Sequence, residues 1–301
     1  MQSFTRGWSF LQEAWSMAFK DKDLIKPSIY ALIVGMIVSV LGVIPIIAVA
    51  FLTSDSAAGN VLMFICGAIL VFVQFVVSYV FSAMTVYLIY GYLAEGDGRM
   101  DKAWAKVQKD FFNILTLAAA STAVNLLRSL AQRNRRGGIG ASIARAATGL
   151  LQVLWTEASY LVLPAMVIDD LNLKDGLARV LKITKENLLL IGISTVGVGW
   201  VTGLISFILG AIGAVIGFAV GYGVYFLFGS GTAAIIIGIA IGAIIFFAFV
   251  MVASVIHTYT TVAYHTCLYL WARETEKVRA TGQAVPAAIP APLAAVLGNA
   301  A

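Results

Sequence analysis

Long apolar runs alternate along the chain with short segments that carry nearly all of its charged residues. The longest run, Asn187 to Trp271, contains no Asp, Glu, Lys or Arg. Because a membrane-spanning helix needs only ~20 apolar residues, the pattern predicts an all-α, polytopic membrane helix bundle over residues 1–276. We expect about six spans, approximately at 28–52, 61–93, 113–132, 139–168, 188–226 and 232–271. The Ala- and Pro-rich tail, 277–301, is expected to be disordered.

Three segments between the apolar runs have the spacing of amphipathic helices. In the first, residues 3–22, aromatic and apolar side chains recur at steps of three and four, namely Phe4, Trp8, Leu11, Trp15 and Phe19. Residues 100–112 and 173–186 carry several lysines each. We predict that all three helices lie on the membrane surface. Each precedes an apolar hairpin, and Ala105-Lys106-Val107 matches Ala178-Arg179-Val180, so the chain has the organisation of a repeated unit.

The distribution of basic residues predicts the orientation. Lys and Arg concentrate in four segments, which six crossings place on one side of the membrane: 1–27, 94–111, 169–187 and 272 onward. Since basic segments stay inside, both termini are expected to be cytoplasmic. The turn with Arg133, Arg135 and Arg136 falls on the opposite side. The alternative is that residues 113–168 dip into the membrane without crossing it, which leaves the termini on the same side.

Composition excludes several classes of protein. Charged residues make up 12% of the chain, hydrophobic residues make up 60%, and the mean hydropathy is +0.93, whereas a soluble domain has roughly 25% charged residues. In such a chain the basic residues behind the net charge of +5 indicate the orientation of the protein in the membrane. We expect a lipid bilayer and no nucleic acid as partner. Cys66 and Cys267 lie in apolar runs, so neither a disulfide nor a metal site is expected. No catalytic or cofactor-binding motif is present, so we expect no enzyme activity and no cofactor.

Polar residues inside the apolar runs are the candidates for function. Two neighbouring helices carry polar stripes, one through Ser121, Asn125, Arg128 and Gln132, the other from Ser142 to Ser159. A charged side chain inside the membrane is costly, so its presence there favours a functional role, and we predict a polar pathway. The candidate residues of this pathway are Asn125, Arg128, Arg145, Gln152, Glu157, His257, Thr261 and His265. The alternatives are a structural ion pair, arginines that reach the interface, and histidines that bond neighbouring helices.

Glycines crowd the charge-free run. Their GxxxG spacing predicts close helix packing, within one protomer or between protomers as a homo-oligomer, at Gly199, Gly203, Gly213, Gly217, Gly221, Gly238 and Gly242. We also expect a glycine-rich bend near Gly210 to Gly223, followed by a long final helix from Thr232 to Trp271.

Two parts of the chain carry a resemblance. The start, with Phe4-Thr-Arg-Gly-Trp8, Ala14-Trp15-Ser16, Asp21-Lys-Asp-Leu24 and Pro27, resembles an uncharacterised prokaryotic family of multi-pass membrane proteins of unknown function. Leu163-Pro-Ala-Met-Val-Ile-Asp-Asp170 and the segment to Asn187 are similar to the middle of that family. The resemblance covers most of residues 1–275 and implies a bacterial or archaeal plasma membrane, but no activity or site.

These patterns leave two hypotheses for function. The first is a transport or channel-type membrane protein with a polar-lined pathway in the hairpin of residues 113–168. The second is a membrane scaffold or assembly partner that transports nothing. The position of Arg128, Arg145 and Glu157, in a hydrated cavity or in a closed ion pair, distinguishes them.

Overall fold

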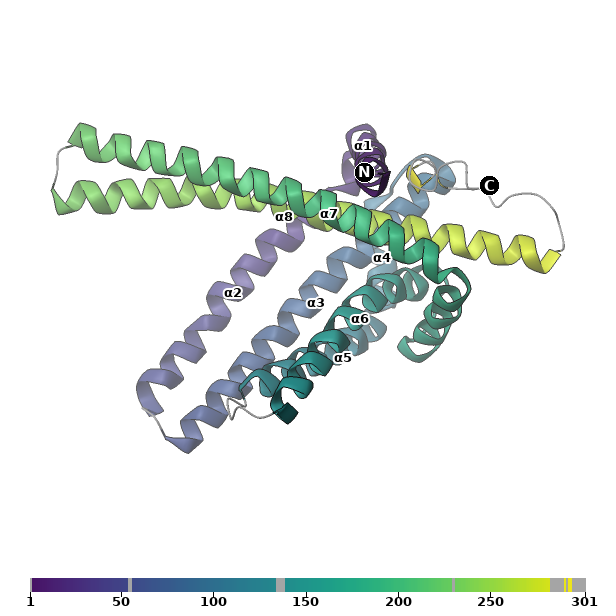
Figure 1. Cartoon of the computed structure of the whole chain (residues 1–301), viewed down its shortest axis with the longest axis horizontal. Coiled ribbons are helices and arrows are strands. Elements are labelled where there is room, and N and C mark those ends of the chain that lie inside the picture. Colours follow the sequence, from purple (N-terminus) through teal and green to yellow (C-terminus); the bar gives the residue numbers. More distant parts are fainter. Residues whose placement is uncertain are drawn as a thin grey trace.

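The computed structural model describes the backbone of residues 2–53, 56–133, 139–228, 231–281, 290 and 292–293 (Figure 1). Side chains are described for these residues except 2–4, 6, 133, 139–143, 186–197, 228 and 279–281. Within this part of the chain every regular element is a helix, as predicted: α1 (Gln2–Lys20), the 3-10 helix η1 (Lys22–Leu24), α2 (Lys26–Thr53), α3 (Ala57–Glu95), α4 (Met100–Lys109), α5 (Phe111–Arg133), α6 (Ile139–Ile168), α7 (Leu173–Phe228) and α8 (Thr232–Thr281). The predicted basic turn at Arg135 and Arg136 lies outside the described residues, as do the side chains of Phe4, Arg133 and Ser142.

Six segments are long and apolar enough to cross a membrane. They are Lys22–Thr53, Ala57–Glu95, Phe111–Gln132, Ala144–Ile168, Val198–Leu227 and Thr232–Val278. Large apolar side chains stand on their outer surface, among them Phe51 with 83% of its area exposed and Phe226 with 77%. Such a surface is unfavourable in water at about 25 cal/mol per Å² and favourable against lipid tails.

The long helices form hairpins that cross one another. α2 pairs with α3, α5 with α6, and α7 with α8. Figure 1 shows α5 and α6 running beside α3, whereas the hairpin of α7 and α8 crosses the others at an angle and extends well beyond them. The end of the α7–α8 hairpin that extends beyond the other helices therefore has few neighbours within the chain.

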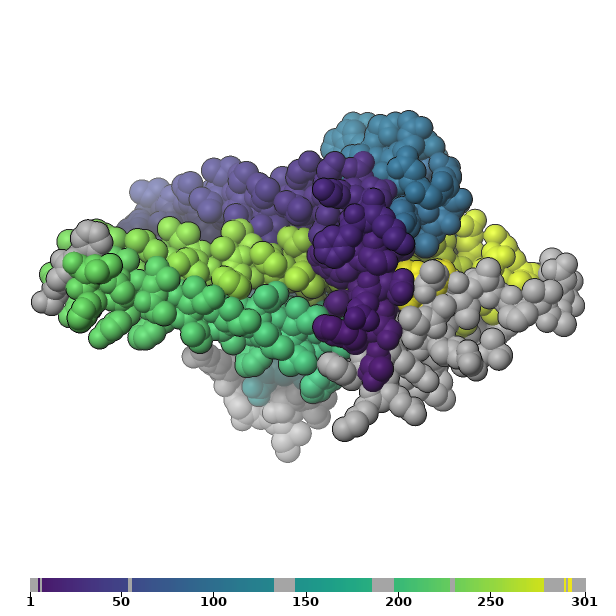
Figure 2. All heavy atoms as spheres, turned by 90° about the horizontal axis from the view of Figure 1, so that it is seen from above, coloured from purple at the N-terminus to yellow at the C-terminus, as the bar shows by residue number. Residues whose placement is uncertain are grey.

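The buried core gathers where the hairpins cross. Tyr259, Tyr264 and Tyr269 of α8 are fully buried there, together with residues of α1, α3, α4, α5 and α6. α1 lies across the hairpin of α7 and α8 in Figure 2. Its contact with α8 is specific, because the Tyr259 hydroxyl donates to the Ala14 carbonyl at 2.9 Å. The Trp15 indole likewise donates to the Thr260 hydroxyl at 3.2 Å.

α1 has two apolar faces, of which the sequence pattern predicted one. Phe10, Ala14 and Met17 form the face that is buried in the core. Trp8 and Phe19, from the predicted aromatic face, are exposed beside it. An exposed aromatic face next to a docked one suits a helix at the membrane surface, where its rings meet the headgroup region.

The second half of the chain differs from the prediction in three places. α7 runs unbroken from Leu173 to Phe228, so the expected surface helix at 173–186 and the expected bend at Gly210 to Gly223 are both parts of one helix. No proline interrupts this segment, and Gly213, Gly217 and Gly221 pack against α8 instead of breaking the helix. α8 continues to Thr281, past the predicted end at Trp271.

The tail beyond α8 is described at three residues, and two of them are buried. Leu293 is fully buried in the core, and its N–H donates to the Pro290 carbonyl at 2.8 Å. Leu293 is therefore a core residue, although it stands in a sequence whose Ala and Pro content is typical of disorder. The rest of the tail beyond α8, apart from Pro290 and Pro292, lies outside the described residues.

Candidate functional site

A polar cavity of about 90 Å³ lies between α3, α5 and α6. One water takes about 30 Å³ of liquid, so the cavity has room for a small polar molecule or a few waters. Its polar lining residues are Ser78, Tyr79, Ser82, Ser121, Asn125, Gln152, Thr156, Ser159 and Tyr160. All three helices that line it are long and apolar enough to cross a membrane. The cavity therefore brings Ser121 and Asn125 of one predicted stripe together with Gln152, Thr156 and Ser159 of the other.

Ser121 is the centre of the hydrogen bonds in this cavity. Its hydroxyl lies 2.7 Å from the Tyr79 hydroxyl and accepts a hydrogen bond from the Trp155 indole at 2.8 Å. The Ser159 hydroxyl donates to the Thr156 carbonyl at 2.8 Å, which turns it back to its own helix. These bonds satisfy side chains of three helices at one level, as buried polar groups require.

One of the two predicted arginines lies beside the cavity. The Arg128 guanidinium donates to Oε1 of Gln152, which lines the cavity, so α5 and α6 are joined at its edge. Asn125 lines the cavity one turn away. Arg145 is exposed on α6 and is absent from the lining. The structure therefore brings Asn125, Arg128 and Gln152 together and leaves Arg145 outside this group.

Glu157 and His265 form a contact between α6 and α8. The imidazole Nε2 lies 3.4 Å from Oε2 of Glu157, and Nδ1 lies 2.7 Å from the Thr261 carbonyl oxygen. The imidazole also stacks on Tyr160, with ring centroids 5.0 Å apart. Because Tyr160 lines the cavity, the pair adjoins it directly.

His257 stands away from this contact. Its side chain is exposed, two turns of α8 before His265. Ser254 and Thr258, its neighbours, line a second cleft of about 180 Å³ between α2, α3 and α8. The eight candidates thus divide into a cavity group, a Glu157–His265–Thr261 group, and the separate residues His257 and Arg145.

The residues contributed by α3 were missed by sequence reasoning. Ser78 lines both the cavity and the second cleft, while Tyr79 and Ser82 line the cavity alone. Gln74 donates to the Gly35 carbonyl at 2.9 Å and to the Ser39 hydroxyl at 2.6 Å, which joins α3 to α2. The signal was present, because Gln74, Ser78 and Ser82 recur every four residues in an otherwise apolar run.

Four of the seven predicted packing glycines meet backbone to backbone. A Cβ atom added at Gly217 would lie 2.5 Å from the Gly242 carbonyl oxygen, and one at Gly221 would lie 2.6 Å from that of Gly238. Gly213 faces the Phe249 side chain. At Gly199 and Gly203 an added Cβ atom would meet no atom within 4 Å. The close contact is therefore between α7 and α8 of one protomer.

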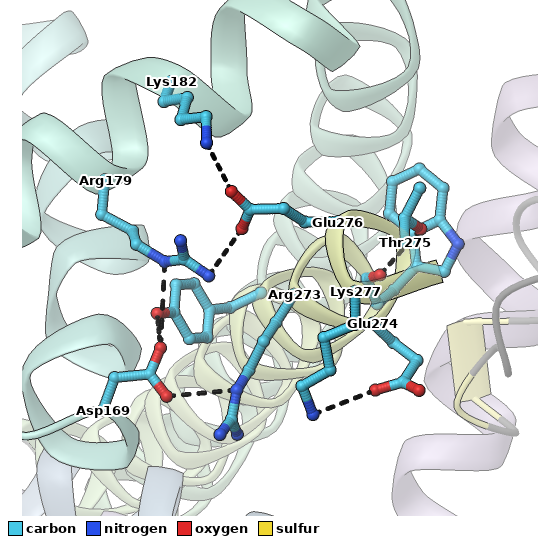
Figure 3. A network of polar contacts seen from close by, with 10 residues as sticks. Asp169, Arg179, Lys182, Arg273, Glu274, Thr275, Glu276 and Lys277 are labelled. Atoms are coloured by element: carbon cyan, nitrogen blue, oxygen red, sulfur yellow. Dashed lines mark hydrogen bonds and ion pairs between the residues drawn. The ribbon is translucent and has the colours of Figure 1, made fainter. Parts of the chain in front are cut away.

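Charged residues near the ends of α6, α7 and α8 join these three helices (Figure 3). Asp169 accepts a hydrogen bond from Tyr269 at 2.5 Å and lies 3.2 Å from Nε of Arg273. Glu276 lies 2.7 Å from Nη2 of Arg179 and 2.6 Å from Nζ of Lys182. We call Asp169, Arg179, Lys182, Tyr269, Arg273 and Glu276 the ionic joint.

The next carboxylate, Asp170, faces the other way and binds α4. Lys106 and Lys109 both contact it, and their hydrogen bonds hold the pKa of Asp170 below its ordinary value. Burial of Lys106 favours its neutral form, but its hydrogen bonds to Asp170 and Asp110 outweigh burial and raise the pKa of Lys106. Asp170 has a positive φ of 55°, a conformation that Asp and Asn tolerate best among residues with a side chain.

The four basic segments meet at one end of the molecule. Three contacts join them in chain order: Asp21 with the Gly98 N–H, Lys106 with Asp170, and Arg179 with Glu276. Six crossings would place these segments on one side of a membrane, and the contacts have that arrangement.

The six apolar helices show which class of protein this chain belongs to. Six apolar helices with lipid-type surfaces, closed at one end by charged contacts, make this chain a multi-pass membrane protein. No protein-family model matches the chain, and no match to a curated protein is significant. Within the described residues, no three His, Cys, Asp or Glu side chains come together as a metal site.

Proposed function

We propose that the protein is a transport or channel-type membrane protein whose pathway for a small polar solute includes the cavity between α3, α5 and α6. The observation that carries the proposal is the lining of that cavity. Its polar side chains come from three apolar helices, at a depth where an unpartnered polar group costs several kcal/mol. Polar groups around an open space at that depth are typical of a solute or ion path.

The residues around the cavity have different roles in the proposed pathway. Ser121 is held by Tyr79 and Trp155, so it fixes the three helices to one another. The amide groups of Asn125 and Gln152 offer both donors and acceptors to a solute. The hydrogen bond from Arg128 to Gln152 closes one edge of the cavity. In the proposed pathway a solute passes this edge when that hydrogen bond breaks.

Flux measurements on proteoliposomes test the proposal. Liposomes of phosphatidylethanolamine and phosphatidylglycerol, with and without the protein, are mixed with hyperosmotic urea or glycerol, and light scattering follows their volume. We expect the protein to speed re-swelling with at least one solute. Asn125→Leu, which keeps the side-chain size and removes its polar atoms, is expected to abolish most of this gain.

A matched serine pair supplies the control. Ser159→Leu fills the cavity, whereas Ser206→Leu changes the same residue type on α7, away from it. We expect loss of flux in the first variant and ordinary flux in the second. Equal rates in protein-containing and protein-free liposomes would refute the proposal.

We also propose that both termini are cytoplasmic and that the membrane is the plasma membrane of a prokaryotic cell. Support comes from the four basic segments, which lie together at one end of the molecule. Cysteines introduced at Gln12 and Lys277, in a variant without Cys66 and Cys267, are expected to react with an impermeant maleimide only after the cells are opened. Labelling in intact cells would contradict this orientation.

A scaffold role is the second candidate, and one observation favours it. An apolar groove of about 540 Å³ follows the hairpin of α7 and α8, lined by residues such as Phe218, Tyr222 and Phe246. Lipid or a helix of another subunit, including a second copy, covers such a surface. Native mass spectrometry from lipid nanodiscs tests this role, since a scaffold retains a stoichiometric partner and a lone transporter releases as a monomer.

A further inference from the structure

Glu157 and His265 meet although 108 positions separate them in the chain. His265 is only 4% exposed, and its ring lies between Tyr160, which stacks on it, and Tyr264, which meets it edge-on at 5.1 Å. The Glu157 side chain remains 49% exposed. One partner of the contact is therefore held rigidly, and the other is accessible from outside the core.

The hydrogen-bond partners determine where protons sit. A carbonyl oxygen only accepts, so the 2.7 Å contact with Thr261 places a hydrogen on Nδ1 of His265. In the neutral imidazole Nε2 is then a bare acceptor, and it faces the Glu157 carboxyl oxygen at 3.4 Å. Two acceptors at this distance repel each other, so the contact needs one proton, either on Nε2 or on Glu157.

We propose that the Glu157–His265 pair is a proton-binding site and that the proton is the coupling ion of the transport proposed above, on which this second part rests. With the proton bound, the pair holds α6 against α8. When the proton leaves, a carboxylate faces a nitrogen lone pair in surroundings of low polarity, and the contact between the helices is lost. The step transfers one proton from one aqueous side to the other and needs no other reactant.

The neighbouring elements present no second charge to the imidazole within the described residues. α6 contributes Tyr160 as well as Glu157, and α3 contributes Tyr79, which approaches Tyr160 and is hydrogen-bonded to Ser121. α1 presents Phe10 to Tyr264. The described cations of α7 that pair with acids, Arg179 and Lys182, belong to the ionic joint, and Lys26 at the start of α2 pairs with Asp23.

Tyr160 connects the proton site to the solute site. Its ring stacks on His265, and the same residue lines the cavity. Movement of α6 away from α8 on deprotonation therefore changes the wall of the cavity. This shared residue is the structural basis for coupling.

The chain contains only two histidines, which makes a direct test simple. Full-length protein labelled with ¹⁵N-histidine in liposomes gives two sets of imidazole signals in solid-state NMR, and His257→Gln removes one set to assign the other. From about pH 5 to about pH 9 we expect Nδ1 of His265 to stay protonated while Nε2 titrates. Glu157→Gln removes the carboxylate that faces Nε2 and is expected to change the fraction of His265 that carries a hydrogen on Nε2 at a given pH, whereas Glu95→Gln, outside the core, leaves it unchanged.

Glu157→Asp serves as the rescue variant, because it keeps a carboxyl group and is expected to restore the titration in part. Titration of Nδ1 instead of Nε2, or a midpoint that ignores Glu157→Gln, would overturn the proton site. Liposome flux under an imposed pH gradient tests the coupling. Solute flux that is equal with and without the gradient refutes coupling and leaves the transport proposal intact, while normal NMR titration with no flux refutes transport and leaves the proton site.

Discussion

Substitution of Gly221 by alanine tests the close contact between α7 and α8. The added Cβ atom would lie 2.6 Å from the Gly238 carbonyl oxygen, about 0.8 Å nearer than an ordinary van der Waals contact. Backbone atoms on both sides cannot rotate away, so the helices must separate at this level. Overpacking of this kind costs about 1–3 kcal/mol, against a gain of up to about 1 kcal/mol in helix propensity. With the full propensity gain subtracted, we expect a net loss of up to about 2 kcal/mol.

Gly223→Ala is the matched control on the same helix. A Cβ atom at Gly223 meets no atom within 4 Å, so only the propensity gain remains, and the variant is expected to be neutral or slightly stabilised. The free energy of unfolding is measured by titration with sodium dodecyl sulfate in mixed micelles. If Gly221→Ala is as stable as Gly223→Ala, the backbone contact described above is wrong.

Three further predictions concern single side chains whose contacts are described above. Hydrogen bonds from Lys106 and Lys109 keep the pKa of Asp170 low, so their stabilisation is present above the ordinary Asp pKa of about 3.9 and is lost as pH falls through the lower folded value. Asp170→Asn, which tolerates the positive φ, should lower thermal stability at pH 7 by no more than about 1 kcal/mol, and the difference from the wild type should shrink as the pH falls below about 3.9. Tyr259→Phe removes the hydrogen bond to α1 and should cost about 1–2 kcal/mol in chemical unfolding, and unchanged stability would contradict a buried bond there. Leu293→Ala should cost about 2–4 kcal/mol and expose the tail to limited proteolysis, whereas a tail that is cut equally in both proteins would mean that Leu293 is not docked.

Sequence reasoning gave the helices and part of the cavity. Apolar runs and polar stripes depend on spacing along one helix, and that spacing places Ser121, Asn125 and Gln152 on definite faces. Part of each stripe lines one cavity. The third wall was missed because Ser78 and Ser82 are two small polar residues in a long apolar run, a pattern that the overall hydropathy outweighs.

Contacts between distant segments had no sequence signal. Glu157 and His265 each stood out alone, but spacing within a helix does not say which neighbour it faces. The same holds for Asp169 and Asp170, whose carboxylates bind opposite partners although they are adjacent. The error at α7 has another origin. Glycine lowers helix propensity in isolation, and the backbone contact with α8 that offsets this appears only in the folded chain.

The docking of α1 on α8 has a consequence for how the protein is made. A ribosome delivers α1 first and α8 last, so the face of Phe10, Ala14 and Met17 has no partner until Tyr259 and Thr260 have been synthesised. During that interval α1 is expected to rest on the membrane surface by its other, aromatic face. A chain that stops before α8 is complete would keep an unpartnered apolar face, and such a surface is what cellular quality control recognises.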